Sequence, residues 1–129
     1  MLYTTLYPLY RDSGFSRKTR ARRYERIRNA VNLQPGQSVL EVGCAAGIDF
    51  MQYAGDFRRT GIDIADIPRV CDFEFHKMDA RKLPWPDKHF DAVVSIGVLE
   101  HVQPMNVLCE VTAEIARVAQ AMGGKAETV

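Results

Sequence analysis

This sequence has no long hydrophobic run, few cysteines and almost no net charge. Its apolar runs, such as Ala92 to Leu99, stop well short of the roughly 20 residues that span a bilayer. The first residues, MLYTTLYPLYRDSG, lack the order of basic and then apolar residues that marks a signal peptide. We therefore expect a cytoplasmic protein with no membrane partner.

The three cysteines are too few and too widely spaced to define a framework. Cys44, Cys71 and Cys109 form no CxxC pair, and no histidine lies near them at the spacing of a metal site. We expect buried free thiols and no bound metal.

The composition favours one compact core. At 129 residues and 47% hydrophobic composition, the chain is long enough for one core and short for two. The net charge of +1 conceals an uneven distribution, because residues 1–30 carry +6 and residues 31–129 carry −5.

The basic residues belong to a predicted amphipathic helix near residues 19–32. Its apolar positions recur at helical spacing: Tyr24, Ile27, Ala30 and Val31. Ahead of it, three tyrosines form a candidate aromatic stripe: Tyr3, Tyr7 and Tyr10. We expect residues 1–34 to form an aromatic and basic cap and residues 35–129 to form the main domain.

Beyond this helix, short apolar runs alternate with amphipathic stretches. The predicted strands are residues 38–42, 60–64, 72–78 and 91–98, and the predicted helices are residues 48–54 and 105–122. This alternation favours a parallel α/β sheet with right-handed crossovers. Only eight residues separate Ile64 from Phe73, so the helix of that crossover is expected to be reduced to a turn.

The stretch SVLEVGCAAGIDF, residues 38–50, predicts a ligand site. A strand that ends in a glycine-rich turn and opens a helix brings backbone amides against a ligand, where a Cβ would block the approach. Gly43 and Gly47 suit that position. Twenty residues after Gly43, the carboxylate of Asp63 can accept hydrogen bonds from ribose hydroxyls. The ligand is therefore expected to contain a nucleoside, although Ala45 and Ile48 break the dinucleotide fingerprint GxGxxG.

These motifs resemble those of the class I S-adenosylmethionine-dependent methyltransferases. LEVGCAAG is similar to their motif I (ExGxGxG), with Ala45 in place of the middle glycine. GIDIAD resembles the end of their second strand, and KMDARKLPWPDKHFDAVVSIGVLEHV resembles their D-A-x-x-L-P-F-P-D-x-S-F-D-x-V stretch. The resemblance covers residues 35 to about 124 and implies a Rossmann-like, doubly wound parallel sheet of strand order 3-2-1-4.

The resemblance also implies which residues hold the adenosine part of the cofactor. Asp63 would bind the ribose, and Ile64 would pack on the adenine. Asp79 would accept a hydrogen bond from the exocyclic amine, with the Ala80 amide at the ring nitrogen.

The methionine part of the cofactor would lie on the glycine turn. By the same resemblance, Glu41 holds the region near the ligand amine and residues 43–45 (Gly43, Cys44 and Ala45) line the methionine. Gly47 belongs to the same turn, and Ile96 and Gly97 would close the far side.

The activity implied is methyl transfer from S-adenosylmethionine to an oxygen, nitrogen or carbon atom of a small-molecule acceptor, with S-adenosylhomocysteine as product. His101 follows the fourth strand, where an acceptor should approach, and could take its proton; a solvated or packing role is the alternative. Two other functions stay open. One is a nucleic-acid methyltransferase that uses the basic helix, and the other is a non-catalytic module that binds the cofactor and assembles.

The family's sheet has seven strands, but this sequence ends at GGKAETV, where the fifth would start. We expect the sheet to stop before or at strand five, which leaves the far edge of the fourth strand unpaired. Either a second copy of the chain covers that edge, making a homo-oligomer, or the sequence is part of a longer natural chain.

Overall fold

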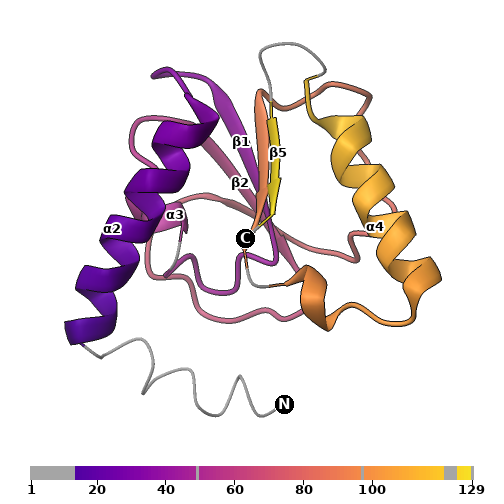
Figure 1. Cartoon of the computed structure of the whole chain (residues 1–129), viewed down its shortest axis with the longest axis horizontal. Coiled ribbons are helices and arrows are strands. Elements are labelled where there is room, and N and C mark those ends of the chain that lie inside the picture. Colours follow the sequence, from indigo (N-terminus) through magenta and orange to yellow (C-terminus); the bar gives the residue numbers. More distant parts are fainter. Residues whose placement is uncertain (1–13, 49, 97, 121–124, 129) are drawn as a thin grey trace.

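The computed structural model describes residues 14–48, 50–96, 98–120 and 125–128. Tyr3, Tyr7, Tyr10 and Gly97 lie outside the described residues. The elements, in chain order, are α2 (Gly14–Val31), β1 (Ser38–Val42), α3 (Phe50–Tyr53), β2 (Arg58–Asp63), β3 (Glu74–Lys77), β4 (Ala92–Ser95), the 3₁₀ helix η1 (Leu99–His101), α4 (Met105–Val118) and β5 (Lys125–Thr128). Figure 1 shows the sheet standing between α2 on one side and α4 on the other.

The sheet is parallel throughout, with strand order β3-β2-β1-β4-β5. The predicted order 3-2-1-4 is confirmed. The expectation that the far edge of the fourth strand is unpaired is wrong, because β5 pairs with β4 from Ala92↔Lys125 to Ser95↔Thr128. Among the described strands, the outermost on that side is therefore β5.

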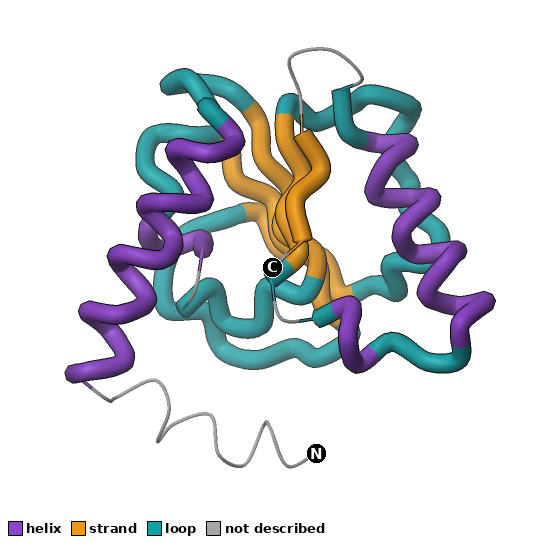
Figure 2. The backbone as a smooth tube through the Cα atoms, viewed as in Figure 1, coloured by secondary structure: helices purple, strands orange, loops and turns teal. Residues whose placement is uncertain are grey.

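The core lies in two layers because side chains alternate along each buried strand. On one face, Val39 of β1 and Val94 of β4 pack with α2 through Tyr24. On the other face, Leu40 and Val93 pack with α4, whose buried residues are Val111, Ile115 and Val118. Figure 2 shows the two helices covering the opposite faces of the twisted sheet.

The basic helix begins earlier than the sequence suggested, at Gly14 rather than near residue 19. Its apolar positions Tyr24, Ile27 and Val31 are buried against the sheet, whereas Arg22 and Arg26 are exposed. The predicted amphipathic arrangement is thus confirmed for these positions and wrong for Ala30, which was expected on the apolar face but is exposed. Within the described part of the chain, no helix has the length and apolar character needed to cross a membrane.

The predictions for the β2–β3 connection and for the helix after the glycine turn have different outcomes. The connection from β2 to β3 contains no helix, as its length predicted. The helix predicted over residues 48–54 is shorter, because α3 spans Phe50–Tyr53 and Gly55 follows with a left-handed φ of 94°.

The free thiols differ in exposure. Cys44 is buried, Cys71 is half-buried and Cys109 is exposed on α4. The expectation of buried thiols is therefore confirmed for Cys44 and wrong for Cys109. Cys109 lies outside the stripe of α4 that faces the sheet.

Candidate cofactor site

The register of the sheet brings the predicted site residues to one edge. Val42 pairs with Ile62 on one side and with Ser95 on the other. The residues that follow each of these, Gly43, Asp63 and Ile96, therefore emerge together at the carboxyl ends of three neighbouring strands. In open α/β sheets this edge is where ligands bind.

The turn after β1 requires small residues for reasons internal to the protein. Gly43 and Gly47 have left-handed φ angles of 82° and 79°. A Cβ on Gly43 would lie 2.3 Å from Cγ2 of Val98, and one on Gly47 would lie 2.5 Å from Cε1 of Phe73. The sequence analysis attributed the need for glycine at these positions to a bound ligand. The backbone conformation and the side chains of Val98 and Phe73 already require glycine there, with or without a ligand.

Ala45 is left-handed as well, with φ 48°. It stands where the motif has its middle glycine, and a non-glycine residue in this conformation costs roughly 1–2 kcal/mol. The backbone N–H of Ala45 donates a hydrogen bond to Oδ2 of Asp63 at 2.8 Å, which fixes the turn against the end of β2.

Asp63 uses its other oxygen in the same way. Its Oδ1 accepts the backbone N–H of Ala65 at 2.9 Å. Each carboxylate oxygen has more than one lone pair, so both can still accept a hydrogen bond from a hydroxyl group of a ligand. The side chain is half-buried and lines the cavity described below.

Glu41 and Cys44 lie behind the turn. Glu41 is 1% exposed in the middle of β1, between Gly61 and Val94. Burial raises the pKa of the Cys44 thiol far above its usual range, and the carboxylates of Glu41 and Asp63 raise that pKa further. Cys44 is therefore a neutral packing residue, and the negative charge at this edge belongs to the carboxylates.

A cavity of about 1210 Å³ opens at this edge of the sheet. Eight residues named from the sequence line it: Gly43, Ala45, Asp63, Ile64, Asp79, Ala80, Ile96 and His101. The predicted site residues within the described part of the chain that do not line it are Glu41, Cys44 and Gly47. Ile64 is 66% exposed, which leaves an apolar side chain at the cavity beside the Asp63 carboxylate.

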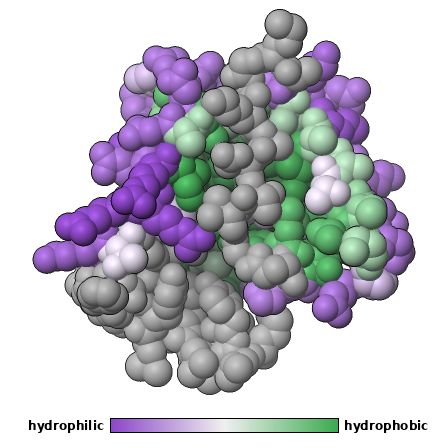
Figure 3. All heavy atoms as spheres, viewed as in Figure 1, coloured by the Kyte–Doolittle hydropathy of each residue, from purple (hydrophilic) through white to green (hydrophobic). Residues whose placement is uncertain are grey.

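The sequence argument missed the opposite wall. Apolar residues from the end of β3, the loop before α4 and α4 itself form it: Met78, Val102, Val107 and Val111. In Figure 3, apolar side chains gather toward the α4 side of the face in view, whereas the α2 side is polar. From α2, Arg23 and Tyr24 also reach the cavity. The helical stripe of α4 was visible in the sequence, but its continuation into the cavity was not.

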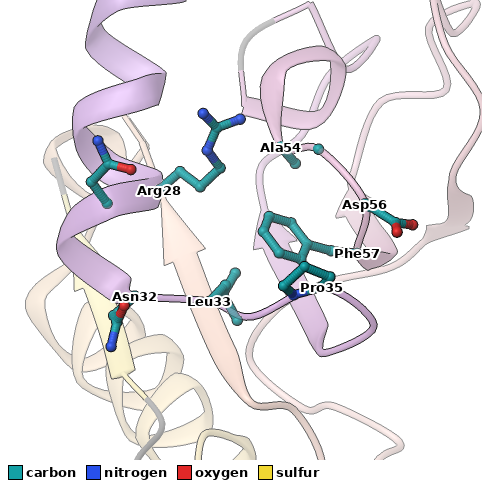
Figure 4. A pocket seen from close by; sticks show the side chains of 9 residues that line it. Arg28, Asn32, Leu33, Pro35, Ala54, Asp56 and Phe57 are labelled. Atoms are coloured by element: carbon teal, nitrogen blue, oxygen red, sulfur yellow. The ribbon is translucent and has the colours of Figure 1, made fainter.

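A second cavity, of about 370 Å³, lies at the other edge of the sheet. It is lined by Arg28 of α2 and by Asn32, which follows that helix, together with Pro35 and Phe57, which precede β1 and β2. In Figure 4, Arg28 extends from α2 toward Ala54. Because the amino ends of parallel strands lie here, this cavity is separate from the predicted cofactor site.

A comparison with known protein families identifies the family of this chain. A family model described as a methyltransferase domain matches residues 40–124. The chain belongs to this methyltransferase family. The match begins within β1 and covers the glycine turn, β2, β3, β4 and α4, which carry most of the residues that line the cavity.

Curated relatives of this chain have different acceptors in their names. The chain is 35% identical over 85 residues to phosphoethanolamine N-methyltransferase 1 from Arabidopsis thaliana, and the matched segment covers 57% of this chain and 17% of the relative. It is 31% identical over 107 residues to probable tRNA methyltransferase 9B from Mus musculus, which covers 79% of this chain and 24% of the relative. The chain thus spans a quarter or less of the length of these relatives.

Solved structures share its fold. The PH0226 protein from Pyrococcus horikoshii superposes with a TM-score of 0.77 at 26% identity, over 98% of this chain and 64% of that one. The 1,6-didemethyltoxoflavin-N1-methyltransferase from Burkholderia thailandensis, solved with S-adenosylhomocysteine bound, has a TM-score of 0.69 at 20% identity, over 92% of this chain and 55% of that one. The cofactor of this family is S-adenosylmethionine.

The cavity fits that cofactor by its chemistry. It presents a carboxylate for hydroxyl groups at Asp63, an exposed apolar side chain at Ile64 and a left-handed backbone at Gly43. These groups match a ribose, an aromatic base and a chain that lies close to the backbone.

Proposed function

We propose that this chain binds S-adenosylmethionine and transfers its methyl group to a small-molecule acceptor. One observation carries the proposal: the predicted cofactor residues and an apolar wall from α4 line the same cavity. Its volume of about 1210 Å³ exceeds the roughly 300–1,000 Å³ of an ordinary ligand pocket, which leaves room for a second molecule.

Each end of the cavity would hold one part of the cofactor. Asp63 binds the ribose hydroxyls, while Ile64, Asp79 and Ala80 receive the adenine. At the other end, the turn at Gly43 to Ala45, together with Glu41 and with Ile96 after β4, receives the methionine. Strand order supports this division, because β2 and β3 lie on one side of β1 and β4 lies on the other.

When bound, S-adenosylmethionine supplies a methyl group made electrophilic by its sulfonium charge. The chain itself has to position the acceptor in line and exclude water, which together account for most of the rate gain in such a displacement. An apolar wall excludes water from the cavity: Met78, Val102, Val107 and Val111. The carboxylates of Glu41 and Asp63 favour the positive charge of the sulfonium.

His101 would take the proton of the acceptor. It lies in η1, in the segment between β4 and α4, and lines the cavity. An imidazole there can act as a general base for a hydroxyl or an amine, a contribution of about 100-fold or more. The variant His101→Gln should therefore lose turnover while its affinity for S-adenosylhomocysteine stays unchanged; loss of both would make it a binding residue.

The test of this function is methyl transfer with labelled cofactor. The purified chain is incubated with S-adenosylmethionine carrying a tritiated methyl group and with panels of amine, carboxylic acid and hydroxyl acceptors. We expect label in one acceptor class, and none with Asp63→Ala. Cofactor binding without transfer to any acceptor would instead favour the non-catalytic module.

A second candidate acceptor is tRNA. The match to the tRNA methyltransferase 9B relative spans 79% of this chain, and α2 presents four exposed basic side chains, of which Arg23 lines the cavity: Lys18, Arg22, Arg23 and Arg26. Such a row of cations could follow a phosphate backbone.

Salt dependence separates the two acceptors. Binding of labelled tRNA is measured by anisotropy between low and physiological salt, with Arg22→Glu/Arg26→Glu and with Lys77→Glu on β3 as the matched control. A tRNA enzyme predicts steep loss of affinity with salt and a smaller slope, by roughly one per lost contact, in the α2 variant. Equal slopes in all three proteins would eliminate this candidate.

A further inference from the structure

The cavity at the amino edge of the sheet is separate from the cofactor cavity. It has a volume of about 370 Å³, and the two cavities share no lining residue. Its other lining residues, Ala54 to Phe57, belong to the connection between α3 and β2, but five precede Leu40, where the family match begins: Arg28, Asn29, Asn32, Leu33 and Pro35. The methyltransferase match therefore accounts for only part of this cavity.

A left-handed glycine keeps the cavity open. Gly55 has a φ of 94° and no side chain. A Cβ built there would lie 3.5 Å from Nη1 of Arg28 and 3.7 Å from Cε2 of Phe57, so the guanidinium and the ring both border the space that a side chain would fill. In Figure 4, Arg28 lies on one side of this space, and Phe57, Pro35 and Leu33 lie on the other. A flat ring system between them would stack on a guanidinium and on an aromatic ring.

The core fixes the apolar side of the cavity. Leu33 and Phe57 are half-buried and pack against the buried cluster that joins α2 to the sheet. Side chains that are already held in place lose little conformational freedom when a ligand binds. The stacking surface is therefore formed before a ligand arrives.

The α2 side of the cavity presents two carboxamides. Asn29 and Asn32 are both exposed and line the cavity. Oδ1 of Asn32 accepts a hydrogen bond from Nε2 of Gln34 at 3.4 Å. A carboxamide carries donors and an acceptor in one plane, as the edges of nucleic-acid bases do. These two side chains therefore suit the edge of a base.

Positive charge around the cavity favours a phosphate. Arg28 lines the cavity, and Arg58 lies next to it, because its Nε donates a hydrogen bond to the carbonyl of Gly36 at 3.1 Å. Asp56 is the lining residue of opposite charge, and its carboxylate points away from Arg28 in Figure 4. Two guanidinium groups thus stand beside the stacking surface.

We propose that this cavity binds a nucleotide, with its base between Arg28 and Phe57 and its edge toward Asn29. The nucleotide is either a free one or a single unpaired nucleotide of an RNA, since both present the same base and phosphate. The volume lies at the lower end of the range for ligand pockets, roughly 300–1,000 Å³, and suits one nucleotide. The proposal does not rest on the proposed function, because no predicted cofactor residue lines this cavity.

NMR spectroscopy of the isotope-labelled chain tests the site directly. The probes are the four nucleoside monophosphates, a single-stranded RNA hexamer of mixed sequence and inorganic phosphate, each titrated separately. The reporters at this cavity are the side-chain amides of Asn29 and Asn32 and the backbone amide of Gly55. The backbone amides of Ile64 and Ala80 report on the cofactor cavity, where a nucleotide could also bind.

We expect a nucleotide probe to shift the signals of Asn29, Asn32 and Gly55, and inorganic phosphate to leave them in place. Shifts with a monophosphate would identify a free nucleotide as the ligand, and shifts with the hexamer alone would identify RNA. Shifts confined to Ile64 and Ala80, equal shifts with inorganic phosphate, or no shift with any probe would overturn the proposal. Because the two cavities have separate reporters, failure here is distinguishable from failure of the cofactor site.

Three variants test the roles of the side chains, with Arg26→Ala as the matched control. Arg26 is an exposed arginine of the same helix that lines neither cavity. Arg28→Ala should weaken binding of the nucleotide probe about fivefold or more. Arg28→Lys keeps the charge without the planar group and should lose part of that affinity. Asn29→Ala should also lose part of it, and it favours the helix, so the fold is retained.

Arg26→Ala should bind the nucleotide probe as tightly as the unmodified chain. Equal weakening by Arg28→Ala and Arg26→Ala would mean attraction by charge alone and would overturn the stacking role of Arg28. Unchanged affinity in both Arg28→Lys and Asn29→Ala would overturn the proposed site even if Arg28→Ala failed to fold.

Discussion

The side chain of Asp63 and the backbone of Ala45 are joined by a hydrogen bond of 2.8 Å that ties the glycine turn to the end of the neighbouring strand. Ala45 is left-handed and only 7% exposed. The carboxylate predicted as the ribose ligand is thus also a support of the turn on which the cofactor would lie.

Removing this support should destabilise the fold. Asp63→Ala leaves the buried N–H of Ala45 without its acceptor, a loss of about 1–3 kcal/mol in the free energy of unfolding. Asp66→Ala is the control, because Asp66 is exposed and pairs with Arg69 on the surface. Urea denaturation measures both variants, and equal effects would contradict the supporting role.

Gly43 is required both by its left-handed backbone and by the close approach of Val98, and the two effects on stability can be measured separately. Gly36 has nearly the same φ, 84° against 82°, but a Cβ there would meet nothing within 4 Å. Gly36→Ala should therefore show the backbone strain alone, about 1–2 kcal/mol, and Gly43→Ala should cost more because of Val98. The double variant Gly43→Ala/Val98→Ala should recover much of the difference. If Gly43→Ala and Gly36→Ala lower the free energy of unfolding equally, the contact with Val98 does not contribute to the need for glycine at position 43.

The pH dependence of stability should include a contribution from α4. The hydrogen bond from Arg117 holds the pKa of Glu114 below its ordinary value, and the Leu83 amide, at 2.7 Å from Oε2, lowers it further against the effect of burial. Because the pKa is lower in the folded state, this stabilisation is present above the ordinary pKa of 4.5 and is lost as pH falls through the lowered value.

The variant Glu114→Gln should therefore flatten the acid limb of a plot of unfolding free energy against pH. Glu25→Gln on the exposed face of α2 controls for loss of one carboxylate. Arg117 also donates to the Leu83 and Trp85 carbonyls, so Glu114→Gln should loosen the loop before β4 and raise its rate of hydrogen exchange. An unchanged acid limb would show that this pair does not respond to pH.

The cysteines should react in the order of their exposure. Cys109 is exposed and Cys71 half-buried, while burial keeps Cys44 protonated by raising its pKa. Iodoacetamide labelling followed by peptide mass spectrometry should modify Cys109 first, then Cys71, and leave Cys44 unmodified in the native state. Labelling of Cys44 as fast as Cys109 would mean that the glycine turn opens in solution.

Local patterns predicted much of the fold and site. The apolar run before Gly43, the acid at Asp63 and the stripe on α4 are short-range signals, and each corresponds to an element or a lining residue of the structure. β5 could not be recognised as a strand by pattern, because KAET contains no apolar alternation and pairs through its backbone with β4.

Long-range contacts account for the residues that the sequence left out. Arg23 reaches the cavity because Tyr24 packs beside Ile96, more than 70 positions along the chain. Val98 limits Gly43 in the same way, through a contact between the segment after β4 and the turn after β1. No local periodicity encodes such pairs, whereas the glycine itself was visible as a signal of a special backbone conformation.

The central claim is that Asp63 and its turn hold the cofactor, and calorimetric titration with S-adenosylhomocysteine tests it most directly. The unmodified chain, Asp63→Ala and Asp66→Ala are compared at a temperature where circular dichroism shows all three to be folded. We predict micromolar binding to the unmodified chain and to Asp66→Ala, and none that is measurable to Asp63→Ala. Equal binding by Asp63→Ala, or no binding by the folded unmodified chain, would contradict the account.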